Sequence, residues 1–102
     1  MHREPQSAIV KHLLGVLRHQ MGRHEEAIAG LHRAVALSPS TAEFHNSLGG
    51  VLGSLGRYLE AVQSLREAVA LHPHYPEAHK NLGIALNGLG DLDGAIGEVC
   101  PW

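Results

Sequence analysis

The chain repeats itself every 34 residues, and this periodicity limits its possible folds more than any other feature. Residues 8–41 and 42–75 share 13 identities over 34 positions without a gap. A third copy begins at Pro76, where Leu82 and Gly83 fall in phase with Leu48 and Gly49. Such a period is typical of arrays in which each unit buries its apolar face against its neighbours. We therefore divide the chain into an N-terminal tail (1–7), two full units (8–41 and 42–75) and a third unit with a truncated second helix (76–102).

Each unit is predicted to form two amphipathic helices joined by a glycine turn. In the second unit, apolar residues recur at helical spacing on both sides of Gly56, and glycine ends a helix at low steric cost. The start signals agree with this division. Ser40 and Glu43 have the spacing of a capping box, Pro76 suits the first turn of a helix, and Asp91 is predicted to cap the last helix.

Small residues in the second unit predict close helix packing. Gly49 and Ala61 fall where its two helices are expected to cross. The glycine-rich stretch 49–56 is not interpreted as a phosphate-binding loop, because no Lys-Ser/Thr pair follows it and it coincides with a predicted helix. Each extra glycine weakens a helix by up to ~1 kcal/mol relative to alanine. From the sequence alone, amide exchange in this helix is therefore expected to be faster than in residues 8–21.

The composition excludes several classes of function. The 102 residues are 44% hydrophobic and 18% charged, with a formal net charge of −2 and no Lys/Arg cluster for binding nucleic acid. No apolar run approaches the ~20 residues that span a bilayer, so no membrane association is expected. The only cysteine is Cys100, so an intrachain disulfide is impossible. Without a recognisable secretion signal, the expected compartment is the cytoplasm.

The repeated residues resemble the tetratricopeptide repeat. Its pattern has Leu-Gly in the first helix, an alanine in the second and a proline after it. The second unit supplies Leu48-Gly49, Ala61 and Pro73 at the matching places, and the match covers residues 8 to about 99. The large aromatic residue near the start of each first helix is replaced by Lys11, His45 and His79. This resemblance implies an all-α, right-handed superhelix of stacked antiparallel helix pairs. The segment 76–83 also resembles the repeats that precede O-GlcNAc-transferase-like catalytic domains.

In the repeats that this chain resembles, the first helices line a concave groove that binds a partner. The matching groove positions are Ile9, His12, Leu13 and Val16 in the first unit, Glu43, Asn46 and Ser47 in the second, and Glu77, Lys80, Asn81, Ile84 and Asn87 in the third. The remaining groove positions hold His19, Gln20, Gly50, Gly53, Ser54 and Gly88.

Two features of this groove allow alternative interpretations. The asparagines are either hydrogen-bonding partners for an extended peptide backbone or solvated polar residues. The apolar stripe formed by Ile9, Leu13 and Val16 either receives a partner's side chains or is covered by a neighbouring segment or a second copy. Some relatives use Lys and Arg to grip the carboxylates of chaperone tails. The corresponding positions here carry no cation and include Glu77, so chaperone-tail binding is not expected.

The sequence predicts a protein-binding scaffold without an enzymatic activity, a cofactor or a metal. The chain has nine histidines, but no two are four residues apart, which is the favoured spacing for a metal-binding pair on a helix. No catalytic constellation is recognisable. One alternative is self-association, because the incomplete third unit leaves apolar residues poorly covered: Leu86, Leu89, Ile96 and Val99. Another is a detached regulatory repeat region of an enzyme such as an O-GlcNAc-transferase-like protein. The sequence identifies no partner and does not tell whether Cys100-Pro101-Trp102 is native.

Overall fold

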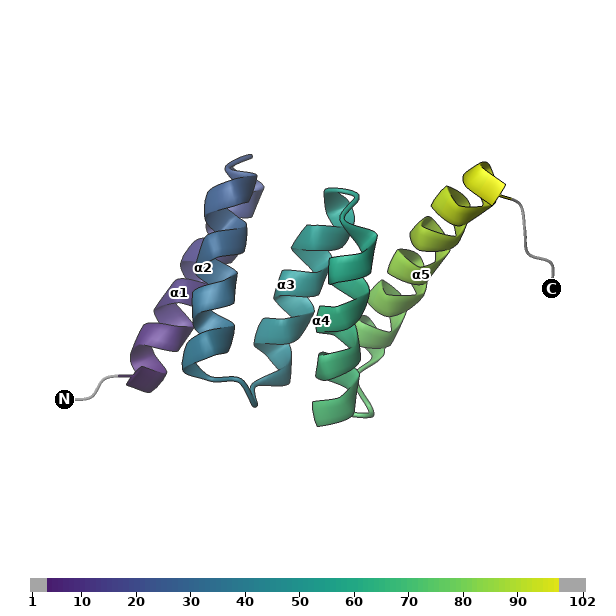
Figure 1. The fold of residues 1–102 in the computed structure, drawn as a ribbon. Helices are drawn as coiled ribbons and strands as arrows, with labels where there is room; N and C mark the ends of the chain where they lie inside the picture. Colours follow the sequence, from purple (N-terminus) through teal and green to yellow (C-terminus); the bar gives the residue numbers. More distant parts are fainter. Residues whose placement is uncertain (1–3, 98–102) are drawn as a thin grey trace.

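The structure is a computed structural model that describes the backbone of residues 4–97 and the side chains of residues 8–90. Within that range the chain forms five helices and no strand (Figure 1). They are α1 (Glu4–Gln20), α2 (His24–Leu37), α3 (Ala42–Ser54), α4 (Tyr58–Leu71) and α5 (Pro76–Gly97). The expected all-α array of stacked antiparallel helix pairs is confirmed, with α1–α2 and α3–α4 as the two complete pairs.

The turn inside each complete pair depends on one glycine. Gly22 and Gly56 both have φ of +83°, which is a left-handed conformation that residues with a Cβ avoid. The hydrogen bonds around Gly56 form a Schellman motif, in which Gly56 N donates to Gly53 O over 3.1 Å and Arg57 N to Leu52 O over 2.9 Å. The same two bonds recur around Gly22, at 3.0 and 2.8 Å. The sequence prediction of glycine turns is therefore confirmed for both complete units.

A second glycine in each pair lets the two helices approach closely. A Cβ at Gly15 would lie 2.8 Å from Leu31 Cγ, and a Cβ at Gly49 would overlap Leu65 Cγ still further. Both leucines are at most 1% exposed, so neither can move aside into solvent. The predicted crossing at Gly49 is therefore present in the structure.

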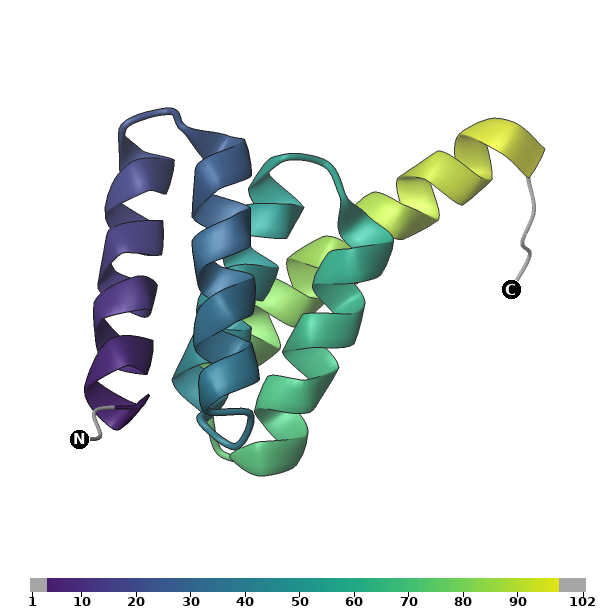
Figure 2. The same cartoon turned by 60° about the vertical axis from the view of Figure 1, so that its left-hand side comes forward.

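The order of contacts gives the array its curvature. Each helix packs on its neighbours in sequence, and the first helices also touch one another, α1 with α3 and α3 with α5. Among the described helices, no Cα atom of α2 lies within 8 Å of one of α4, and an ion pair of 3.8 Å joins Glu25 of α2 to Arg57 just before α4. Because the first helices converge while the second helices diverge, α1, α3 and α5 lie on the inner side of the bend (Figure 2).

The main core lies between α2, α3 and α4 and extends to α5. Leu31, Leu52 and Leu65 are its largest fully buried side chains. Ala34 and Phe44 form a smaller cluster with Ala8, where α1, α2 and α3 meet. Because α3 contacts every other helix, it is the central element of the array.

The third unit differs from its prediction. α5 runs without interruption from Pro76 to Gly97. The glycine turn expected inside this unit, which the repeat phase places at Gly90, and the helix cap expected at Asp91 are therefore wrong. Continuing a formed helix needs no new nucleus, whereas a separate helix between Asp91 and Pro101 would be short and marginal alone. The helix start at Pro76 is confirmed, and the structure adds that Ala78 and Ala85 are buried.

Two other helix starts also differ from the sequence prediction. α1 begins at Glu4, so residues 4–7 belong to a helix and not to a tail. Pro5 in the first turn is compatible with this start, because that position needs no backbone donor. The residue that precedes α3 is Thr41, whose side chain makes no capping bond but pairs with Ser38 Oγ at 2.7 Å. The predicted capping box of Ser40 and Glu43 is therefore absent.

Candidate functional site

The predicted groove residues lie on α1, α3 and α5, the inner helices of the bend. Ile9 and Leu13 on α1 are 52% and 59% exposed, and Ile84 on α5 is 56% exposed. Val16 is half-buried, whereas Glu43, Glu77, Lys80 and Asn87 are exposed. These positions come from three separate units and reach a common inner side because the first helices contact one another.

Polar side chains join successive first helices at a constant offset of 35 residues. His12 Nε2 and Ser47 Oγ form a hydrogen bond of 2.6 Å between α1 and α3. One unit further on, Asn81 Nδ2 on α5 donates to Asn46 Oδ1 on α3 over 3.1 Å. We call these two pairs the inner rungs. The sequence predicted His12, Asn46, Ser47 and Asn81 as groove residues but did not predict that they pair with one another.

The inner rungs change what these side chains offer to a ligand. Asn46 is only 6% exposed, so its amide serves mainly the packing of α3 against α5. Asn81 is half-buried and uses its amino group in the rung, which leaves its carbonyl oxygen as an acceptor. His12 also stacks on Phe44, with ring centroids 4.8 Å apart.

An open depression of about 200 Å³ lies beside the rungs. Its lining comes from all three inner helices: Val16, His19, Asn46, Ser47, Gly50, Val51, Glu77 and Asn81. It therefore collects five of the twelve residues of the predicted groove. Gly50 is half-buried within it, and a Cβ there would lie 3.7 Å from Asn81 Nδ2, so the wall has room for a small side chain.

The two acidic groove residues influence their titratable neighbours. Burial lowers the pKa of His12 below its ordinary value of 6.5, and the nearby charge of Glu43 opposes that shift. Burial also raises the pKa of Tyr75, and the charges of Glu43 and Glu77 raise it further. Tyr75, at the junction of the second and third units, is thus close to both carboxylates. Sequence reasoning missed it because it lies in a loop between units.

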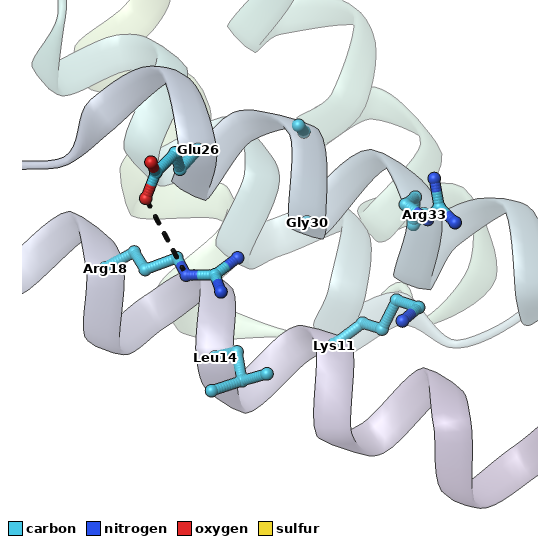
Figure 3. A pocket seen from close by; sticks show the side chains of 7 residues that line it. Lys11, Leu14, Arg18, Glu26, Gly30 and Arg33 are labelled. Carbon is cyan, nitrogen blue, oxygen red and sulfur yellow. Dashed lines mark ion pairs between the residues drawn. The ribbon is translucent and has the colours of Figure 1, made fainter.

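A second surface feature, absent from the sequence prediction, lies between α1 and α2. It is a depression of about 300 Å³, which we call the cationic notch (Figure 3). Its lining residues are Lys11, Leu14, Arg18, Glu26, Ala29, Gly30 and Arg33, so it holds three cations and one carboxylate. The ion pair drawn in Figure 3 joins Arg18 Nε to Glu26 Oε1 over 3.9 Å. Comparing the units would have revealed the notch, since His45, Leu52 and Glu67 stand at the positions of Lys11, Arg18 and Arg33.

The described residues also bear on metal and membrane binding. Among them, no three His, Cys, Asp or Glu side chains are grouped as a metal site requires. The ring nitrogens His19 Nδ1 and His24 Nδ1 lie 3.2 Å apart as a hydrogen-bonding pair. Within the same part of the chain, no helix combines the length and apolar character needed to cross a bilayer.

Comparison with known proteins identifies the repeat. Two sequence profiles of the tetratricopeptide repeat match this chain, one over residues 6–72 and the other over residues 51–100. A search of curated proteins finds no match.

Several solved structures share the fold. A crystal structure of MamA protein is 28% identical with a TM-score of 0.79, and the match covers 90% of this chain and 50% of that one. The second repeat domain of Spaghetti (RPAP3), bound to the HSP90 peptide SRMEEVD, is 26% identical with a TM-score of 0.81, over 89% and 84% of the two chains. An O-GlcNAc transferase mutant from Thermobaculum terrenum is 40% identical with a TM-score of 0.75, over 80% of this chain and 16% of that one.

These matches differ in how much of the related protein they include. The chain spans half the length of MamA and less than a fifth of the transferase, but most of the RPAP3 domain. One profile alone covers more than half of this chain, and it agrees with the 34-residue period, the glycine turns and the stacked helix pairs. The chain therefore belongs to the tetratricopeptide repeat family.

Proposed function

We propose that this protein is a non-catalytic scaffold that binds a partner peptide or helix on the inner side of its bend. The observation that carries the proposal is the depression beside the inner rungs, which has walls from three units and a glycine in its lining. A peptide lying there meets the carbonyl of Asn81 and the exposed apolar stripe of Ile9 and Leu13. The peptide complex of the RPAP3 domain supports this mode of binding by a protein of the same fold.

The charges of the groove favour a different peptide from the acidic HSP90 tail. Positions that would grip a carboxylate hold His12, Val16, Ser47, Glu77 and Asn81, and none carries a fixed positive charge. Glu43 and Glu77 are exposed one unit apart, with Tyr75 close to both. Among the twelve predicted groove residues, Lys80 offsets one of these two carboxylates, which leaves a formal charge of −1. The proposed ligand is therefore a neutral or basic peptide segment.

The test is a peptide-display selection on the intact chain, repeated on a variant with a filled groove. Gly50→Leu places a side chain in the depression without replacing any polar group there. Gly83→Leu is the matched control, because a Cβ at Gly83 meets no atom within 4 Å and Gly83 is outside the depression. Both changes replace a helical glycine with the same helix-favouring residue.

The proposal predicts that peptides selected on the natural chain bind Gly83→Leu normally and lose at least tenfold in affinity for Gly50→Leu. The peptide SRMEEVD is expected to bind more weakly than the selected sequences. Equal binding to both variants would place the binding surface elsewhere. Preferential selection of acidic C-terminal peptides would contradict the charge argument.

A second candidate function is self-association through the third unit. Leu86 is 41% exposed on α5, and Gly83 lacks the second-helix leucine that covers Gly15 and Gly49. The side chains of Ile96 and Val99, which the sequence assigned to the same patch, lie outside the described residues. A third candidate is a repeat region that serves a larger enzyme, which the 40% identity to part of the transferase favours. The cytoplasmic location remains a prediction from the sequence.

A further inference from the structure

The exposed side of α1 has the composition of an interface between units. Four apolar residues lie along one stripe of the helix and are 40% to 57% exposed: Val10, Leu14, Leu17 and Met21. Their equivalents on α3 are Phe44, Leu48, Val51 and Leu55. The first three of these are at most 5% exposed, and Leu55 is partly buried. We call the four α1 residues the outer face.

Inside the molecule, the equivalent faces of α3 and α5 are each covered by the second helix of the preceding unit. Ile28 and Leu31 of α2 share a core cluster with Leu48 and Val51 of α3. Val62 and Leu65 of α4 share the same cluster with Ala85 of α5. In both cases the second helix of one unit packs on the first helix of the next. Within the described residues, no second helix covers the outer face of α1 in this way.

The charges beside the outer face do not suit another unit like the two complete ones. Arg18 stands where α3 has Leu52, which is 1% exposed, and Lys11 stands where α3 has the buried His45. Arg18 already pairs with Glu26, but the notch around them holds three cations and one carboxylate, so covering it with an unchanged second helix would bury excess positive charge, which is costly. The helix that fits here must carry carboxylates beside its apolar stripe.

The chain contains one such segment, residues 91–99. Its repeat phase places Ile96 with Ile28 and Val62, and Val99 with Leu31 and Leu65. These four residues belong to the core cluster that reaches the following first helix, and the two leucines also pack on the first helix of their own unit. In a helix, Leu92, Ala95, Ile96 and Val99 share one stripe, with Asp91 and Glu98 together on one flank of it. Asp91 and Glu98 are seven residues apart, as are Lys11 and Arg18, so both pairs have a spacing of about 10.5 Å along a helix.

The position of α5 makes this segment available to another molecule. Beyond the part of α5 that packs on α4, its C-terminal end extends away from the body in both views (Figures 1 and 2). α1 and this end of α5 lie at opposite ends of an array 55 Å long, so the contact is one between two molecules.

We propose that the outer face of α1 binds the acidic segment 91–99 of a second copy of this chain, head to tail. Ile96 and Val99 of one copy cover the outer face of the next, while Asp91 and Glu98 pair with Lys11 and Arg18. The contact joins two different surfaces, so it propagates into chains or closed rings and is not limited to a symmetric dimer. This inference gives the surfaces for the self-association proposed above as the second candidate function, and it does not depend on peptide binding in the groove.

Light scattering and sedimentation over a concentration series of the full chain test this arrangement. The natural chain is expected to grow in mass with concentration, and less so at high salt, because exposed ion pairs are screened. Lys11→Glu/Arg18→Glu and Asp91→Lys/Glu98→Lys are each expected to weaken association by roughly tenfold or more. Mixing the two variants is expected to restore association. The acidic α1 face of the first variant then meets the basic 91–99 segment of the second, and the unchanged surfaces of the two variants also match.

The charge-swap design separates the possible failures. Arg66→Glu reverses an exposed charge on α4 away from both surfaces and is the matched control for Arg18→Glu, with natural association expected. A chain that stays monomeric at every concentration overturns both self-association and this arrangement of it. Association that survives either double reversal, or variants that remain apart when mixed, overturns the head-to-tail contact alone. Recovery on mixing requires both variants to be folded, so misfolding cannot imitate the expected result.

Discussion

Replacing Gly49 and Gly83 separately by alanine measures how closely α3 and α4 pack. The two glycines occupy the same place in successive units and both lie inside helices, so each substitution gains up to ~1 kcal/mol of helix propensity. The Cβ at Gly83 meets nothing within 4 Å, and that variant is expected to be more stable by roughly 0.5–1 kcal/mol. The Cβ at Gly49 overlaps Leu65, which is 1% exposed and cannot turn outward.

The difference between the two variants isolates the cost of overpacking. Adding a methyl group to a tightly packed core typically costs about 1–3 kcal/mol. Because the gain in helix propensity is common to both variants, Gly49→Ala should be less stable than Gly83→Ala by about that amount.

Urea unfolding followed by circular dichroism, at a concentration where the chain is monomeric, gives this difference directly. With a denaturant slope of about 1–3 kcal/mol per molar, the two midpoints should differ by roughly 1 M. If Gly49→Ala proves as stable as Gly83→Ala, the helices of the second unit do not cross at Gly49, and the packing argument for the repeat is wrong.

Three further predictions concern the turns, the titration of His12 and the central helix. Gly56→Ala should lower the free energy of unfolding by about 1 kcal/mol or more because φ is +83° there, whereas Gly90→Ala should raise it because α5 is continuous; a loss at both positions in urea titrations would restore the turn predicted at Gly90. Burial lowers the pKa of His12 below 6.5, so the unfolded chain holds more protons at mildly acidic pH. The stability that depends on the neutral ring is complete above pH 6.5 and is lost as pH falls below it. Subtracting the stability profile of His12→Gln from the natural one between pH 5 and 7.5 should show this loss, and identical profiles would contradict it. Amide exchange should be slower in α3 than in α1, because α3 contacts four helices and α1 only two; faster exchange in α3 would mean that its glycines outweigh its burial.

The sequence predicted those parts of the fold that depend on residues repeated at a fixed period. The turns at Gly22 and Gly56 and the crossing at Gly49 each need a residue without a side chain, so their recurrence every 34 positions was informative. The same reasoning failed at Gly90, because an identical residue does not produce a turn unless a second helix packs back on the first. Asp91 illustrates the same limit, since a good capping residue can also lie inside a continuing helix.

The candidate site was less predictable because it depends on differences between units. Position alone identified Asn46 and Asn81 as groove residues, but their mutual hydrogen bond and the burial of Asn46 depend on the distance between α3 and α5. The sequence analysis also predicted fraying of α3 from its glycines. The central position of α3 argues for the opposite, and the amide-exchange measurement decides between the two predictions. The cationic notch is a departure from the repeat, so a search for shared residues overlooked Arg18.

First helices approach one another more closely than second helices do, and this difference has a mechanical consequence. The inner rungs tie α1 to α3 and α3 to α5, so the inner edge of the array has a nearly fixed length. The outer edge has a looser tie, an exposed ion pair of 3.8 Å between Glu25 of α2 and Arg57 just before α4, because the backbones of these two helices do not approach closely. We therefore expect the array to bend about its inner edge, so that its curvature changes as the gap between α2 and α4 opens or closes. A ligand that bridges successive inner helices would set that curvature, and the separation of the second helices would report its binding.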